Sequence, residues 1–300
     1  MKIGLVLSGG GGKGAYELGV WKALKELDLA KHIDVFSGTS IGAFNAVLFA
    51  QDDMVLAEGL WDEVTMDKLV PLSKFELFRK GMGLAIGSKN PNFAKKYINQ
   101  KLEEGTVSKD GALEFIEKYL KVNRLREREK ICYVTCTELP DLKVRYFRLN
   151  DYDEKIAKDM ILASASLPLI YDCTMVLENN YVDGGLVDNT PIQPVYGEGC
   201  DIIIVVLLSK DVKIDRSLYP NTHIIEISPK NLDETVLSGT LNLEKESKKN
   251  RIREGYNDTK ILFEPIMLMA NLKKENEDKE SNPKLYKYYN WMRKFSRDNE

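Results

Sequence analysis

One pentapeptide carries the residue types most clearly suited to chemistry. It has the form G-x-S-x-G and comprises Gly38, Thr39, Ser40, Ile41 and Gly42. Apolar runs precede it at Ile33 to Phe36 and follow it at Ala43 to Gln51, so the serine is expected on a sharp turn between a strand and a helix. The flanking glycines remove side chains that would collide with these elements, which leaves the hydroxyl open. Ser40 is therefore the candidate nucleophile for acyl transfer.

A second glycine-rich segment follows the first apolar run, Ile3 to Leu7. It comprises Gly9, Gly10, Gly11, Gly12, Lys13 and Gly14. Without side chains, successive amides can point at one oxygen atom, and the start of the following helix adds partial positive charge. The segment is thus suited to stabilise an oxyanion. It also matches the G-x-G-x-x-G fingerprint of dinucleotide-binding proteins, so a nicotinamide-dependent oxidoreductase is the main alternative.

Two observations weigh against a nucleotide at this loop. The acidic residue that binds ribose is expected at the end of the second strand, but that strand runs into Ser37-Gly38-Thr39-Ser40, and Asp34 lies too early. A Walker phosphate loop is excluded because Gly14 follows Lys13, where Ser or Thr is required. The anion at the glycine loop is therefore expected to be a transient intermediate.

A nucleophilic serine needs a base, and the sequence offers few. The chain has two histidines, His32 and His223, and both lie at the beginning of predicted strands, at the sheet edge opposite Ser40. A carboxylate can serve instead. The best candidate is Asp183 in the segment Asp183-Gly184-Gly185, although Asp-Gly-Gly alone is most often only a turn.

The surrounding pattern alternates between strands and helices. Buried strands are expected at Ile3 to Leu7, Ile33 to Phe36 and Asp201 to Ser209. This order predicts a three-layer α/β/α fold with a mostly parallel central sheet. We expect one catalytic domain over residues 1–210, with a helical insertion at about 52–130, and a strand and helices over 211–300 that pack on or extend it.

Composition and charge limit the partners. With 43 basic and 46 acidic residues among 300, nothing indicates a nucleic-acid partner. The longest uninterrupted apolar run, Ile202 to Leu208, is far below the roughly 20 residues of a membrane-spanning helix, so lipid contact is expected only at the membrane surface. The N-terminal apolar stretch is too short for a signal peptide, which makes a cytoplasmic location the default and signal-less export an alternative.

Taken together and in this order, the three segments resemble the patatin-like phospholipase family, bacterial type. The resemblance covers about residues 2–209 and includes the runs Ala163 to Pro168 and Asp188 to Pro191 on either side of the Asp-Gly-Gly motif. It implies a Ser-Asp dyad of Ser40 and Asp183 without histidine, and an oxyanion hole that uses the amides of the glycine loop. One departure is Lys13, where the family often has arginine; lysine keeps the charge but loses the planar fork.

The resemblance implies hydrolysis of fatty-acyl esters of phospholipids or related glycerolipids through an acyl-enzyme, with no metal or organic cofactor. Apolar residues of the insertion, together with Phe44 and Leu48, could line an acyl channel, and the basic stretch Lys248 to Arg253 could touch anionic headgroups. A small-ester or thioester hydrolase, or an acyltransferase, would share the dyad and is the closest alternative.

Overall fold

The computed structural model describes residues 1–70, 107–210, 212–230 and 239–281, and side chains as far as residue 273. The chain divides into two compact units, residues 1–258 and 259–300. The first unit contains the three motifs at residues 9–14, 38–42 and 183–185. Among the described residues, no helix is both long enough and apolar enough to cross a membrane.

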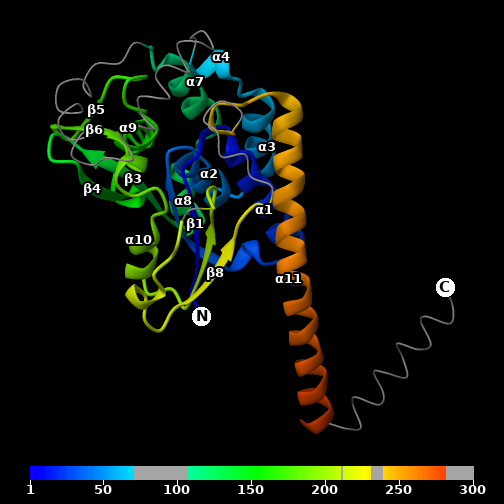
Figure 1. Ribbon diagram of the computed structural model, residues 1–300. Helices are drawn as coiled ribbons and strands as arrows, with labels where there is room; N and C mark the ends of the chain where they lie inside the picture. Colours follow the sequence, from blue (N-terminus) through cyan, green and yellow to red (C-terminus); the bar gives the residue numbers. More distant parts are fainter. Residues whose placement is uncertain (71–106, 211, 231–238, 282–300) are drawn as a thin grey trace. The chain divides into compact units, whose positions relative to one another are not determined.

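A single eight-stranded sheet forms the centre of the first unit (Figure 1). Its strands are β1 Ile3–Leu7, β2 Ile33–Thr39, β3 Ile131–Glu138, β4 Lys143–Arg148, β5 Thr174–Val176, β6 Asn179–Asp183, β7 Ile202–Val206 and β8 His223–Ile227. Their order is β5-β6-β3-β2-β1-β7-β8, with β4 also paired to β3. Five neighbouring strands, β3, β2, β1, β7 and β8, are parallel to one another. At the other end of the sheet, β4 and β6 pair with β3, and β5 with β6, in antiparallel fashion. The predicted mostly parallel sheet is confirmed.

Helices cover both faces of this sheet. The helices of the described residues are α1 Ala15–Glu26, α2 Ile41–Ala50, α3 Met54–Glu63, α4 Met66–Leu69, α7 Asp110–Tyr119, α8 Asn123–Glu127, α9 Glu154–Ser164, α10 Ile192–Gly197 and α11 Lys245–Ser281, of which residues 245–258 belong to the first unit. On one face, α10 packs its Val195 against Val6 and Val35 of the sheet. On the other, α2 contacts β1, β2 and β3, α9 contacts β3, β5 and β6, and α1 packs on α2 (Figure 1). The predicted three-layer α/β/α architecture is confirmed.

The first part of α11 belongs to the layer of α1. The two helices cross at glycines: a Cβ on Gly19 would lie 1.9 Å from the Ile252 carbonyl oxygen, and one on Gly255 would lie 2.1 Å from the Tyr16 carbonyl oxygen. Lys248 donates to the Val64 carbonyl over 2.6 Å and is buried. The expectation that this basic stretch reaches lipid headgroups is therefore wrong for Lys248, because its charge is used inside the unit.

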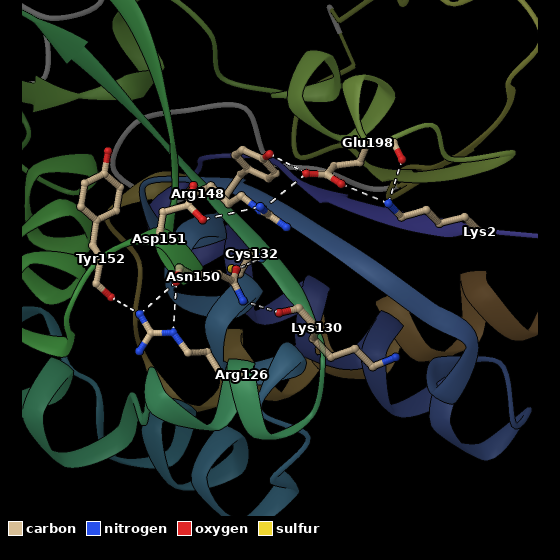
Figure 2. A network of polar contacts seen from close by, with 10 residues as sticks. Lys2, Arg126, Lys130, Cys132, Arg148, Asn150, Asp151, Tyr152 and Glu198 are labelled. Carbon is tan, nitrogen blue, oxygen red and sulfur yellow. Dashed lines mark hydrogen bonds and ion pairs between the residues drawn. The ribbon is translucent and has the colours of Figure 1, made fainter.

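Glu198 joins several elements at the sheet edge where β1 and β3 begin (Figure 2). Its carboxylate accepts hydrogen bonds from Tyr133 over 2.7 Å and from Lys2 over 3.1 Å. Arg148, at the end of β4, approaches it to 3.6 Å. The network ties α10 to β1, β3 and β4 at the edge opposite the catalytic motifs.

The second strand is longer than predicted. Residues 37–39 were expected in the turn but complete β2, which extends through Thr39. The reason is pairing on both sides, because Gly38 lies opposite Leu7 of β1 and Thr39 lies opposite Thr135 of β3. The turn is thus compressed to Ser40 alone.

Candidate active site

Ser40 lies between the last residue of β2 and the first residue of α2. Its backbone has φ 56° and ψ −123°, a conformation that non-glycine residues rarely adopt and that costs on the order of 1–3 kcal/mol. A Cβ on Gly38 would lie 2.1 Å from the Gly42 carbonyl oxygen, and one on Gly42 would lie 2.4 Å from the Leu7 carbonyl oxygen. Both glycines are therefore required for the sharp turn.

The sheet register brings Asp183 to this turn. Asp183 ends β6 and pairs with Cys136, next to the Thr135 that pairs with Thr39. A Cβ on Gly184 would lie 2.3 Å from the Thr135 carbonyl oxygen, so the chain after the aspartate can run this close to β3 only as glycine. As a result, the Ser40 hydroxyl faces the Asp183 carboxyl.

The Asp183 carboxyl is almost completely shielded, with 3% of the residue exposed. Its Oδ1 accepts a hydrogen bond from the Gly185 amide over 2.8 Å. The other oxygen, Oδ2, is buried and accepts no hydrogen bond of ordinary geometry from the described residues. Burial raises the pKa of Asp183 to about 6, although interactions with the Ser40 hydroxyl and the Gly185 amide oppose this shift. Such a group can accept a proton near neutral pH.

The glycine loop borders the same site. Residues Gly11–Gly14 form one turn of 3-10 helix before α1, and Gly11 has φ 54°, a conformation that favours glycine. Gly11 and Gly12 line the same cavity as Ser40. The first amides of such a helix have no acceptor within it and are suited to bind an anion.

Two amides of the predicted oxyanion set are already engaged. The Gly9 amide donates to the Asn189 carbonyl and the Lys13 amide donates to the Gly10 carbonyl, each over 3.1 Å. The Lys13 side chain is buried and donates to the Leu208 carbonyl over 2.9 Å. Gly9 and Lys13 therefore shape the loop and anchor it, rather than offering amides to a ligand.

An apolar cavity extends from Ser40. The volume of this cavity is about 770 Å³ when the solvent-filled opening is included. The lining side chains come from α2, α3, α4, α7 and the loop before β5, and include Phe44, Leu60, Leu69, Phe115 and Tyr171. Thr240, Leu241 and Leu243 add a wall from the segment before α11.

The cavity includes only part of the predicted acyl channel. Phe44 lines it as expected, whereas Leu48 is fully buried and is not among the lining residues. The prediction was wrong for Leu48 because the helix turns that residue into the core. Residues 71–106 of the predicted insertion lie outside the described part of the chain.

Both histidines lie away from Ser40. His32 precedes β2 and His223 begins β8, and both are exposed. The seven residues of β2 separate His32 from Ser40 by roughly 20 Å. Within the described residues, no group of three or more His, Cys, Asp or Glu side chains could hold a metal ion. Among the side chains described, Asp183 is the base that faces Ser40.

Comparison with known proteins agrees with this geometry. The family model described as patatin-like phospholipase matches residues 5–196, which include all three motifs. The chain belongs to the patatin-like phospholipase family. Membership also removes the nicotinamide alternative, since in this family member β2 runs directly into the Ser40 turn and ends in no acidic residue.

Relatives of this patatin-like chain include much longer proteins. It is 28% identical over 208 residues to lysophospholipase nte1 of Aspergillus terreus, covering 68% of the chain and 12% of that relative. It is 27% identical over 219 residues to lysophospholipase NTE1 of Saccharomyces cerevisiae, covering 68% of the chain and 10% of that relative. Among solved structures, VipD from Legionella pneumophila aligns with a TM-score of 0.51 and 16% identity over 88% of this chain and 66% of that one. This likeness shows a shared fold.

Three contributors to the patatin-like site were not predicted from the sequence. Asn189 donates from Nδ2 to the Gly9 carbonyl over 3.0 Å and so joins the Asp-Gly-Gly side to the glycine loop. Ser164 contacts the Ser40 amide, and Leu241 lines the cavity. The resemblance had included Asn189 and Ser164 in supporting runs without giving them a role. No local signal pointed to Leu241, which begins a highly charged helical pattern in the sequence.

Proposed function

We propose that this protein is a serine lipid acyl hydrolase that cleaves fatty-acyl esters of phospholipids or related glycerolipids. The observation that carries the proposal is the juxtaposition at Ser40. The serine lines an apolar cavity and faces a buried carboxyl, Asp183, whose pKa is about 6. Asp183 Oδ2 is shielded and makes no ordinary hydrogen bond with the described residues. A nucleophile, a base and a binding space for an acyl chain therefore meet at one point.

The first half of the proposed reaction forms an acyl-enzyme. The Ser40 oxygen attacks the ester carbonyl carbon while Asp183 accepts the hydroxyl proton. Negative charge develops on the carbonyl oxygen, and the amides of Gly10, Gly11 and Gly12 stabilise it. The intermediate then collapses, the bond to the alcohol oxygen breaks, and Asp183 returns the proton to the leaving alcohol.

The second half releases the fatty acid. A water molecule attacks the acyl-enzyme carbonyl and gives its proton to Asp183. The same amides stabilise the second oxyanion, and the proton returns to the Ser40 oxygen as the ester bond breaks. Each catalytic group ends the cycle in its starting state.

The shape and chemistry of the cavity support an acyl chain as the bound group. Phe44, Leu60 and Phe115 present apolar surface next to the nucleophile. The Tyr171 hydroxyl donates to the Leu69 carbonyl over 2.8 Å, so its polar end is satisfied by the protein. Relatives named lysophospholipase make single-chain phospholipids the first substrates to test.

The proposal is tested by incubating the purified chain with phosphatidylcholine and lysophosphatidylcholine vesicles and measuring free fatty acid by mass spectrometry. Ser40→Ala and Asp183→Asn should each reduce the rate by at least about 1,000-fold. The double variant His32→Ala/His223→Ala is the matched control and should keep at least half of the activity, because both histidines lie at the opposite sheet edge. A Ser40→Ala protein that still releases fatty acid would disprove the proposal.

A further inference from the structure

The strained backbone at Ser40 must be held by neighbouring groups. A non-glycine residue with φ 56° and ψ −123° returns to a more favourable conformation unless its surroundings fix it. The Ser40 carbonyl is held by the amides of Ala43 over 2.9 Å and Phe44 over 3.4 Å, in the first turn of α2. The Ser40 amide is the other group that needs a partner, because β2 has ended and its ladder no longer supplies one.

Ser164 supplies that partner. Its Oγ accepts the hydrogen bond of the Ser40 amide over 3.0 Å and donates to the Thr135 carbonyl over 2.7 Å. Ser164 is the last residue of α9 and is fully buried. Thr135 is the β3 residue opposite Thr39, so the Ser164 hydroxyl stands where the ladder between β2 and β3 stops. One hydroxyl thus joins the sheet, α9 and the nucleophile.

The turn that follows α9 also holds the proposed base. The Ser166 carbonyl accepts the Asp183 amide over 2.9 Å. The Ser166 hydroxyl is used differently, since it donates to the Leu162 carbonyl over 2.8 Å within its own turn. The backbones of Ser40 and Asp183 are therefore both bonded to residues at the end of one helix.

We propose that Ser164 is a positioning residue that fixes the Ser40 backbone in the conformation needed for attack, a role that rests on the proposed function of Ser40. Its effect is exerted through the Ser40 amide. Because that amide donates to Ser164, it is occupied and the oxyanion is left to other donors. Removal of the Ser164 hydroxyl leaves a buried amide without its acceptor, and the turn relaxes away from its strained geometry.

The experiment compares Ser164→Ala with Ser164→Thr, which keeps the hydroxyl. One readout is exchange of the Ser40 amide proton by NMR, which needs no catalysis. The second is the rate at which a fluorophosphonate probe labels Ser40, together with kcat and KM on a soluble ester. In Ser164→Ala, amide exchange should accelerate by at least about tenfold, and labelling and kcat should fall by roughly 10- to 100-fold with KM changed less than about twofold. Ser164→Thr should restore most of the labelling rate.

Ser37→Ala is the matched control. Ser37 is also a fully buried serine, and its hydroxyl donates to the Pro191 carbonyl over 2.6 Å without contacting Ser40. Unchanged exchange and labelling in folded Ser164→Ala would overturn the proposal, and so would an equal loss in Ser37→Ala. If Ser164→Ala does not fold, Ser164→Cys replaces it, with the same outcomes required. If the wild-type Ser40 is never labelled, the proposed function fails, while amide exchange still decides whether Ser164 holds the turn.

Discussion

Burial determines the pH range in which Asp183 can act. Because its pKa is about 6, the carboxyl is protonated below that pH and cannot accept the Ser40 proton. We expect kcat/KM on a soluble ester to rise with pH through a midpoint near 6 and to fall about tenfold for each pH unit below it. Initial rates between pH 4.5 and 8.5 measure this. Full activity at pH 4.5 would show that Asp183 is not the base.

The same shift makes Asp183 costly to the folded state. A carboxyl whose pKa rises from 3.8 to about 6 on folding makes a contribution to stability that is fully present below pH 3.8 and is lost as the pH rises through about 6. Asp183→Asn should therefore increase the free energy of unfolding at pH 7 by on the order of 3 kcal/mol while abolishing activity. Urea unfolding at pH 7 and pH 4 checks this, since the gain should largely vanish at pH 4. Equal gains at both pH values would contradict it.

A site residue could be predicted from the sequence when its role depends on residues next to it in the chain. Ser40 and the glycine loop were predictable because their steric needs are met by neighbours in sequence, as with Gly38 and Gly42. Asp183 required the family resemblance, since Asp-Gly-Gly alone also describes a turn. Ser164 carries no local signal, because its role depends on the Thr135 carbonyl and the Ser40 amide, which only the tertiary structure brings together.

Three helices are joined beneath the glycine loop by one buried side chain. Asn45 of α2 donates to the Gly14 carbonyl over 3.0 Å and to Glu17 of α1 over 2.8 Å, and accepts from Trp61 of α3 over 2.9 Å. Asn45→Ala removes three buried hydrogen bonds and should lower the free energy of unfolding by about 3 kcal/mol. Chemical denaturation measures the loss.

Two variants test whether this loss comes from the buried network. Asn123→Ala is the control, because Asn123 is exposed and its substitution should change stability by less than about 0.5 kcal/mol. Glu17→Gln should also be well tolerated. Burial raises the pKa of Glu17 well above its usual range, although Asn45 and the Ser8 amide oppose this shift, so burial favours the uncharged form that the amide of Gln resembles. A large loss in Glu17→Gln would show that the charged form is needed.

Glu198 lies at the end of the sheet that is opposite Ser40, and its carboxylate joins α10 to β3, β4 and the start of β1 (Figure 2). Burial alone would raise the pKa of Glu198, but hydrogen bonds from Tyr133 and Lys2 and the nearby charges of Lys2 and Arg148 outweigh burial and lower it. Its contribution to stability is therefore present above the unfolded pKa of about 4.3 and is lost as the pH falls through the lower folded value. Glu198→Gln should cost about 1–2 kcal/mol at pH 7, and less as the pH falls through the lowered folded pKa, as urea unfolding at several pH values measures. Unchanged activity of the folded variant at pH 7 confirms that the effect is structural.

The elements differ in how well their sequences define them. The apolar runs of β1 and β7 were predicted because burial on both faces leaves continuous hydrophobic sequence. Residues 37–39 have no such pattern, and they form strand only because β1 and β3 pair with them on both sides. The segment before α11 is another such case, since Leu241 and Leu243 gain their role from the glycine loop and α3 beside them.

At the scale of the whole molecule, the cavity combines segments that are far apart in the sequence. Ser40 and Phe44 lie near the beginning, Phe115 lies on α7, and Leu241 and Leu243 precede α11. If an acyl chain occupies this space, each added methylene is worth about 0.8 kcal/mol, or roughly fourfold in kcat/KM, until the cavity is full. Rates on p-nitrophenyl esters from acetate to myristate measure this dependence.

Variants of the C-terminal wall decide whether the cavity binds the acyl chain. Leu241→Ala and Leu243→Ala should reduce kcat/KM on long-chain esters by roughly tenfold and change the rate on the acetate ester much less, because both side chains line the apolar cavity that a long chain would fill. Leu218→Ala is the matched control, since Leu218 is 62% exposed and does not line the cavity. A rate independent of chain length in the wild type, or equal losses on acetate and myristate in the wall variants, would favour a small-ester hydrolase. If kcat/KM rises steeply with acyl-chain length in the wild type and less steeply in both wall variants, the segment before α11 helps to set the substrate range.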